Sequence, residues 1–258
     1  MLVRASTGTV IGVDARPGGW ACAQVDIGGE GFGGGEGRAG GAGEADAGDT
    51  AGSSPRTPVR WLSLSSLPEV LALPADVVGV DIPVGLPERG RRACDLAAKA
   101  RLGAAHARVF LTPPRAVLEA ADHASASALH RTLVDGKGMS IQTWHVLGKV
   151  AEADAALADE GEDVHRRVVE VHPELSFAAL AGHPLASKRT AAGRAARIAA
   201  LQTWLPELRA RDVPPGDDHL DALAAAWSAA RWRAGTATVL PAGPVPRDQL
   251  GMPQRIVI

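Results

Sequence analysis

Short runs of β-branched and aliphatic residues dominate the first third of the chain, and turn-forming residues separate them. These runs predict strands at about 8–14, 20–27 and 58–64, a short helix near 65–72, and a buried strand at 77–82. The first three strands look like consecutive partners in one antiparallel meander.

The hydrophobic pattern changes after this region, because apolar residues recur with a period near 3.6 throughout residues 89–163. This spacing predicts a long helical segment. The run RRVVEV predicts a fifth strand at 166–171, and helical patterns return at 190–211 and 217–234. The proline-rich tail at 241–258 is expected to be irregular.

This order of elements allows few folds, since a long helical connection between two strands implies a right-handed parallel crossover. We expect an α/β fold with a mixed five-stranded sheet, formed by a three-strand antiparallel meander plus two parallel strands. Helices should cover both faces, with a helical insert at 89–163 between strands 4 and 5. Residues 1–240 should form one domain. The glycine-rich segment at 28–56 should be a disordered loop inside it.

Composition narrows the class of protein. The chain has 258 residues, of which 46% are hydrophobic, enough for a sizeable core. Cys22 and Cys94 lie far apart, so neither a disulfide framework nor a zinc site is indicated. No stretch approaches the roughly 18 apolar residues of a membrane helix, and we expect a cytoplasmic protein that does not bind membranes. A net charge of −2 excludes the strongly basic field of nucleic-acid-coating proteins.

Five acidic residues lie at positions where folding can bring their carboxylates together into one site. Asp14, Asp81 and Glu170 each end a strand-forming run, and Asp218 and Asp221 lie three residues apart on the last helix. If strands 1, 4 and 5 are neighbours, the first three carboxylates lie about 4.8 Å apart at one end of the sheet. Carboxylates gathered in this way repel each other unless a divalent cation binds them. Oxygen donors favour Mg²⁺ or Mn²⁺ over zinc.

Ordinary structural roles remain open for several of these residues. Asp14 and Asp81 both precede proline-containing loops, where aspartate is a common turn residue. Asp217 or Asp218 can serve as the N-cap of the last helix. Asp221 lies one turn inside that helix, where a free carboxylate gains little.

Seven sequence blocks follow one another between about residues 10 and 240. They are IGVDARPGGW, GVDIPVGLP, RRACDLAAKARLG, SIQTWHVLGKVAEAD, EVHPELSFAAL, SKRTAAGR and DDHLDALAAAW. In this order they resemble the domain of unknown function family 429 (DUF429), which is described as predicted nucleases with a ribonuclease H-like fold. The stretch DHLDALAAA in the last block is also similar to the final helix of RuvC-type Holliday-junction resolvases.

The resemblance implies a metal-dependent nuclease with a ribonuclease H-like sheet. It places Asp14 on the first strand and Asp81 on the fourth as catalytic metal ligands. Glu170 and Asp221 complete this catalytic set, and Asp218 joins them as a further metal ligand. Mg²⁺ or Mn²⁺ is the implied cofactor, and a nucleic acid or nucleotide phosphodiester is the implied substrate.

Polar and basic side chains elsewhere in the same blocks are candidates for binding the substrate. Two basic stretches, 88–115 and 187–211, can meet phosphates or can simply solvate a helix face. Glu174 can equally be an acid at the start of a helix. The candidate substrate-binding residues are Arg92, Arg101, Gln142, His172, Glu174 and Lys188.

Two other functions fit parts of the pattern. A non-catalytic binding or regulatory protein could keep the fold and hold a partner on its helical insert. An ATPase or kinase of the actin-like superfold would also carry Asp14 on its first strand. That class needs an Asp-x-Gly-Thr-like phosphate loop, which neither DARPGGW nor DIPVGLP supplies. The sequence leaves open whether a nuclease of this kind would cleave DNA, RNA or a small nucleotide.

Overall fold

A computed structural model describes residues 7–28, 59–158 and 160–258 of the chain. The predicted glycine-rich insert at 28–56 therefore lies, apart from Gly28, outside the described residues. The described ranges contain no helix that is both long enough and apolar enough to cross a bilayer.

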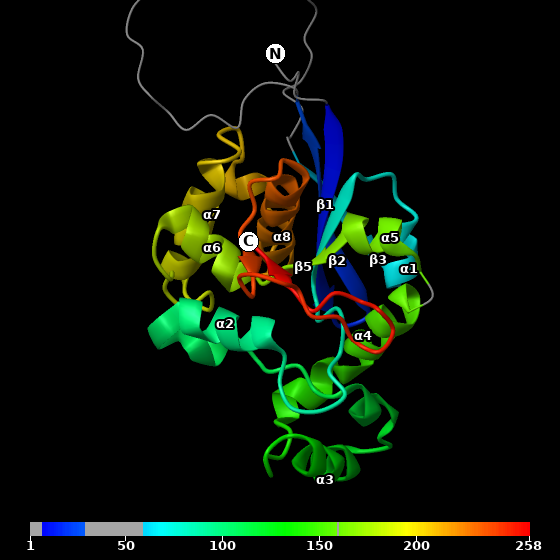
Figure 1. The fold of residues 1–258 in the computed structure, drawn as a ribbon. Helices are drawn as coiled ribbons and strands as arrows, with labels where there is room; N and C mark the ends of the chain where they lie inside the picture. The colour runs from blue at the N-terminus through cyan, green and yellow to red at the C-terminus, as the bar shows by residue number, and fades with distance from the viewer. Residues whose placement is uncertain (1–6, 29–58, 159) are drawn as a thin grey trace, which may run out of the picture.

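The centre of the fold is a five-stranded sheet with the strand order β3-β2-β1-β4-β5 (Figure 1). β1 pairs antiparallel with β2, and β2 pairs antiparallel with β3. β1 pairs parallel with β4, and β4 pairs parallel with β5. The predicted meander with two added parallel strands is confirmed. The strands are β1 (Gly8–Arg16), β2 (Gly19–Ile27), β3 (Val59–Leu64), β4 (Val77–Asp81) and β5 (Val168–Glu170).

Helices cover both faces of this sheet, as predicted, and an insert of helices separates β4 from β5. Figure 1 shows α6, α7 and α8 on one side of the sheet and α1, α4 and α5 on the other, with α3 far from the strands. The helices are α1 (Leu67–Leu71), α2 (Ala93–Leu102), α3 (His123–Leu133), α4 (Ile141–Leu157), α5 (Glu162–Arg167), α6 (Pro173–Ala181), α7 (Ala191–Gln202) and α8 (Asp218–Arg233), with 3₁₀ turns at Gly103–Arg108, Arg115–Glu119 and Ala210–Asp212.

Alternation along the strands divides the core into two layers, because successive side chains in a strand point to opposite faces. Val10, Val77 and Val169 are buried beneath α6, α7 and α8. Val78 and Val80 are buried on the other face, beneath α1 and α4. Both faces of the central strands are therefore buried from solvent, as in other sheets with parallel strands.

Local differences from the sequence prediction have identifiable causes. The segment 89–163 is not continuously helical, since prolines at 113 and 114 and short 3₁₀ turns interrupt it. The fifth strand is shorter than predicted, because α5 continues to Arg167. The tail is not entirely irregular. Its β-branched end forms a two-stranded sheet, β6 (Val239–Leu240) with β7 (Ile256–Val257).

One contact between layers is unusually close. At Gly12 in β1, a Cβ atom would lie 1.8 Å from the carbonyl oxygen of Ala222 and 2.2 Å from the backbone nitrogen of Ala226. The neighbouring Gly79 in β4 faces the same helix, where a Cβ would lie 2.6 Å from the carbonyl oxygen of Ala225. Gly12 and Gly79 form a row of glycines across the two strands. Because this row and the alanine-rich α8 lack large side chains, the backbone of the helix contacts the strands directly.

We expect Gly12→Ala to lower the free energy of unfolding by about 3 kcal/mol or more, because the clashing atoms belong to a helix backbone that cannot rotate away. Gly148→Ala is the matched control. Gly148 lies inside α4, is exposed, and has nothing within 4 Å of a Cβ, so this change should stabilise the protein by about 0.5–1 kcal/mol. Denaturant unfolding measures both values. Equal effects of the two substitutions would contradict the close packing of α8.

Candidate functional site

Two aspartates lie side by side at the carboxyl end of the sheet. Asp14 and Asp81 are paired in register on the parallel strands β1 and β4. Each follows a glycine of the close contact by two residues, so both side chains lie on the face covered by α8. Asp14 is only 9% exposed. The close approach of α8 therefore encloses a pair of carboxylates rather than apolar side chains.

The helix α8 supplies two further aspartates to the same place. Pro214, Pro215 and Gly216 precede the helix and end the chain segment before it. Asp217 occupies the N-cap position but makes no capping hydrogen bond with its side chain. Asp221 lies one turn inside the helix and is 4% exposed, whereas Asp218 is partly exposed. An N-cap role thus does not account for Asp221.

The carboxylates disfavour one another's charge. Burial raises the pKa of Asp14 well above its usual value, and Asp81 and Asp221 raise it further. Burial also raises the pKa of Asp81 well above its usual value, with Asp221 as the next cause. The pKa of Asp221 is raised by burial, and Lys188 opposes this shift. The three carboxylates therefore interact as one acidic cluster, in which each ionised group makes ionisation of the others less favourable.

Lys188 provides the positive charge nearest to this cluster. Its Nζ donates a 2.5 Å hydrogen bond to Oδ2 of Asp221, and 40% of its side chain is exposed. Burial lowers the pKa of Lys188, but Asp221 more than offsets this effect, so its pKa lies above the usual value. The other oxygen of Asp221, Oδ1, is buried and has no hydrogen-bond partner among the described residues.

The donor chemistry of the site fits a hard divalent cation. Three neighbouring carboxylates, of which Asp14 and Asp221 are buried, offer only oxygen ligands, and the unpartnered Oδ1 of Asp221 requires a cation or a donor. The arrangement is nevertheless not a closed metal site. Within the described ranges, no group of three or more His, Cys, Asp or Glu side chains is already positioned around a common point. Lys188 lies against Asp221, so binding of an ion there requires the lysine to move.

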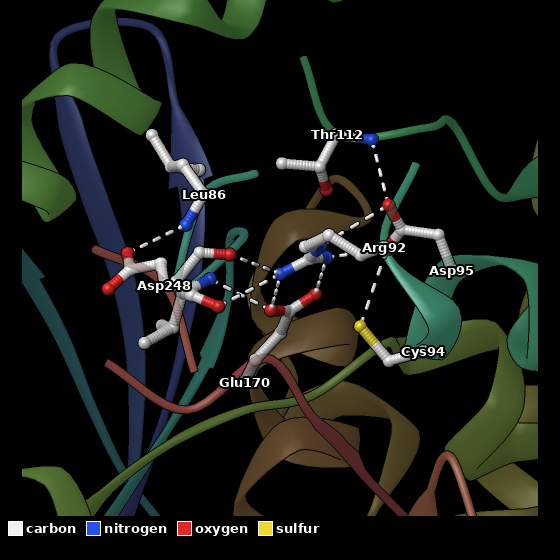
Figure 2. Close-up of polar contacts among 9 residues, drawn as sticks. Leu86, Arg92, Cys94, Asp95, Thr112, Glu170 and Asp248 are labelled. Atoms are coloured by element: carbon white, nitrogen blue, oxygen red, sulfur yellow. Dashed lines mark hydrogen bonds and ion pairs between the residues drawn. The ribbon is translucent and has the colours of Figure 1, made fainter. Parts of the chain in front are cut away.

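Glu170 reaches the same end of the sheet. Its side chain leaves β5 on the other face, yet it lies close enough to Asp81 to raise the pKa of that carboxyl and lines a small hollow with it. Its partner in the β4–β5 register is Val80 rather than Asp81, and side chains one residue apart point to opposite faces. Arg92 binds both of its oxygens, Nη1 to Oε2 at 2.6 Å and Nη2 to Oε1 at 2.7 Å (Figure 2). Burial raises the pKa of Glu170 to about 7, against the effect of Arg92. Its role as a metal ligand stays a prediction.

Arg92 is the centre of a buried ionic network below the loop that follows Asp81. It is 1% exposed and also binds Asp95, whose Oδ2 accepts a hydrogen bond from the backbone of Thr112 at 2.9 Å. The network holds the loop itself, since Val84 donates its backbone N–H to Glu170 at 2.8 Å and accepts from Arg92 at 2.9 Å. Arg92 is thus sequestered from solvent, and its predicted contact with substrate would require this network to open.

A residue of the tail completes the support of this loop. Asp248 accepts a hydrogen bond from the backbone N–H of Leu86 at 3.0 Å and pairs with Arg115, which also pairs with Asp154 (Figure 2 shows the contact with Leu86). The sequence prediction missed Asp248 and Arg115. Nothing in the local pattern PRDQLG distinguishes this aspartate from an ordinary surface residue.

Comparison with known families gives a match over most of the chain. The model of the family described as protein of unknown function (DUF429) matches residues 12–245. The chain belongs to the DUF429 family. The DUF429 match spans Asp14, Asp81 and Asp221 as well as the helices that enclose them. Searches of curated proteins and of solved structures gave no significant match.

The DUF429 chain forms a cavity of about 340 Å³ beside Asp81 and Asp221. His172, Glu174 and Lys188, three of the predicted substrate-binding residues, line it. Burial lowers the pKa of His172, and its Nδ1 is buried without a partner among the described residues. Glu174 is held by Arg108 and Arg197, both at 2.5 Å. The sequence prediction did not select several other lining residues, namely Arg108, Phe110, Ser187 and Arg189.

The remaining two candidates lie apart from this cavity. Arg101 is an exposed residue near the end of α2, and Gln142 is exposed in the first turn of α4. Neither lines the cavity beside Asp81. Their contact with substrate stays a prediction, and it would require a ligand that extends beyond the cavity.

The buried carboxylates predict an inverse pH dependence of stability. A carboxyl with a raised pKa in the folded state destabilises the fold once pH exceeds its unfolded value near 4, and the effect grows until the folded-state pKa is passed. In EDTA at pH 8, Asp14→Asn should therefore raise the free energy of unfolding by about 1–3 kcal/mol. The gain should shrink as pH falls toward 4. Thermal unfolding across this range measures it.

Asp163→Asn is the control for this experiment, because the Asp163 side chain is 94% exposed and its ion pair with Arg166 lies in solvent, where such pairs contribute little. Its unfolding curve should stay within about 1 kcal/mol of that of the native protein, without the gain at pH 8. A loss of stability for Asp14→Asn at pH 8 would show that the aspartates do not repel one another in the fold.

Arg92, the residue that precedes α2, and Arg101 near the end of α2 should respond differently to replacement by methionine. Arg92→Met leaves the buried Glu170 and Asp95 without their cation, and we expect a loss of about 3–5 kcal/mol. Arg101→Met changes an exposed side chain and should leave stability nearly unchanged. Chemical denaturation of both variants tests this contrast, and equal midpoints would refute the structural role of Arg92.

Proposed function

We propose that this DUF429 protein is a divalent-metal-dependent phosphodiesterase that acts on nucleic acid. The observation that carries the proposal is the meeting of Asp14 and Asp81, paired on adjacent strands at the carboxyl end of the mixed sheet, with Asp221 of α8, the helix that covers them. Buried like charges are costly, and proteins keep them where the charge has a function. The sheet order supports the same conclusion, since it is the one expected of the ribonuclease H-like fold.

Asp14, Asp81 and Asp221 would hold Mg²⁺ or Mn²⁺, with the more exposed Asp218 beside them. A bound divalent ion supplies Lewis acidity toward a phosphoryl oxygen and offsets the negative charge that develops there. The protein contributes the fixed position of the ligands. The parallel pairing of β1 and β4 sets the spacing between Asp14 and Asp81. The contact of the α8 backbone with Gly12 sets the distance of Asp221 from the sheet.

Lys188 has two available partners in this proposal. Without substrate its ammonium group neutralises Asp221. Its partly exposed side chain lines the cavity, so it can turn to a phosphate oxygen when a cation binds the carboxylates. Exchange of one anionic partner for another keeps the lysine paired throughout.

His172 adds a group able to handle a proton. Burial favours its neutral imidazole, and the unpartnered Nδ1 belongs to a residue that lines the cavity. A neutral imidazole can orient a water or accept its proton. We assign His172 this role in preference to cation binding, because the three aspartates already supply the oxygen ligands that Mg²⁺ prefers.

A second candidate function follows from the ion pair of Lys188 with Asp221. That pair partly neutralises the acidic cluster without any metal, and the described residues contain no closed metal site. A binding protein that keeps the fold without catalysis would show the same features. The response to metal separates the two functions.

Addition of millimolar Mn²⁺ or Mg²⁺ should raise the melting temperature of the native protein, because a ligand that binds only the folded state stabilises it. Asp81→Asn should abolish this response and lower the rate of phosphodiester cleavage at least ~100-fold. Thermal scans with and without metal, and a panel of labelled DNA and RNA substrates, measure both effects.

Asp163→Asn again serves as the matched change from carboxylate to amide at an exposed position, and it should keep both the metal response and the activity. Cleavage that survives in Asp81→Asn would identify a contaminant. If native protein neither responds to metal nor cleaves any substrate, the binding-protein alternative replaces the proposed enzyme.

A further inference from the structure

The cavity beside the carboxylates combines three kinds of side chain. Asp81 and Asp221 contribute carboxylates, and the positive charge comes from Arg108, Lys188 and Arg189. Phe110 adds an aromatic ring to the same lining. This combination differs from a simple phosphate pocket, which needs no exposed aromatic group.

Phe110 is distinguished by its exposure and its place. The chain has three phenylalanines and no tyrosine. Phe177 is fully buried, whereas Phe110 is 38% exposed. Single exposed apolar residues are common on protein surfaces and alone mean little. Phe110, however, lines both the 340 Å³ cavity and a smaller adjoining hollow that also contains Asp81. Its ring thus lies where a ligand would approach the carboxylates.

The positive charges around Phe110 are partly available to a ligand. Arg189 is exposed and makes no ion pair among the described residues. Arg108 is bound to Glu174 and to the carbonyl of Leu185, yet 32% of its side chain is exposed. Together with Lys188 they give the cavity a cationic rim around an acidic interior. Such a rim suits the phosphates on either side of a scissile bond.

We propose that this cavity binds one unstacked nucleotide of a single-stranded nucleic acid, with its base on the ring of Phe110 and its flanking phosphates at Arg189 and Lys188. The inference rests on the proposed phosphodiesterase function and specifies its substrate class. A volume of about 340 Å³ is at the lower end of small-ligand sites, which suits a single nucleotide.

The recessed position of the carboxylates excludes a regular duplex. Asp14 and Asp221 are 9% and 4% exposed, so the reacting phosphate must enter the cavity. A base within a duplex has neighbours on both faces and cannot stack on a protein ring, whereas bases of single strands can be splayed out onto aromatic side chains. The geometry therefore favours single strands, loops or frayed ends.

Binding to short fluorescent oligonucleotides tests the inference directly. Anisotropy titrations of the full chain in EDTA compare single-stranded DNA, single-stranded RNA and duplexes of the same sequence. EDTA prevents metal-dependent cleavage and leaves Lys188 paired with Asp221, so these titrations test the contacts of Phe110 and Arg189. Native protein should bind one or both single strands at least ~10-fold more tightly than the duplex. Comparison of the DNA and RNA arms identifies the preferred sugar.

Phe110→Ala should weaken binding to the single strand about tenfold, the usual effect of losing one stacked base, and Phe110→Trp should retain it. Leu250→Ala is the control, because Leu250 is 41% exposed and does not line the cavity. Arg189→Gln should reduce the slope of log Kd against log salt by about 0.7, the value for one phosphate contact on a single strand.

Equal binding of duplex and single strand, or equal effects of Phe110→Ala and Leu250→Ala, would overturn the inference even if the protein cleaves nucleic acid in Mn²⁺. Conversely, selective binding of single strands that depends on Phe110, without any cleavage in Mn²⁺, would support the binding site and reject the proposed phosphodiesterase. The two failures are therefore distinguishable.

Discussion

Direct contact between the backbone of α8 and the strands β1 and β4 is the constraint on which the site depends. Gly12 and Gly79 leave no side chain between the layers, and alanines of α8 keep the helix side thin. Because Asp14 and Asp81 follow these glycines by two residues, they meet the first turns of the same helix. A bulkier residue in the row would lift α8 and carry Asp221 away from its partners.

Two electrostatic solutions operate on opposite faces of this sheet edge. On the face of α6 and α8, the carboxylates are crowded, and Lys188 is the main cation that offsets them, with a smaller contribution from Arg197 at Asp221. At Glu170, Arg92 binds both carboxylate oxygens and also pairs with Asp95. This network holds the loop after β4 in place, whereas Oδ1 of Asp221 has no hydrogen-bond partner among the described residues.

The sheet and the acidic pair followed from sequence, because strand periodicity and strand-ending aspartates are local signals. Residue parity explains why the surroundings of Glu170 differ from those of the aspartates. Glu170 also ends a strand, but a register offset of one residue, invisible without the paired strand, turns its side chain to the other face of β5. The burial of Arg92 did not follow from sequence, because charge patterns do not reveal burial. Phe110 and Asp248 gave no signal, since their importance arises from contacts between distant segments.

The attachment of the C-terminal segment has a consequence for biosynthesis. Asp248 supports the loop after β4, and Val257 bridges to Val171 beside β5. While the ribosome is still translating, strands β1 to β5 can pair before these residues have emerged. The loop beside Asp81 then lacks its last tether. A nascent chain would thus lack this tether at Asp81 until the segment that carries Asp248 has emerged and reached the sheet.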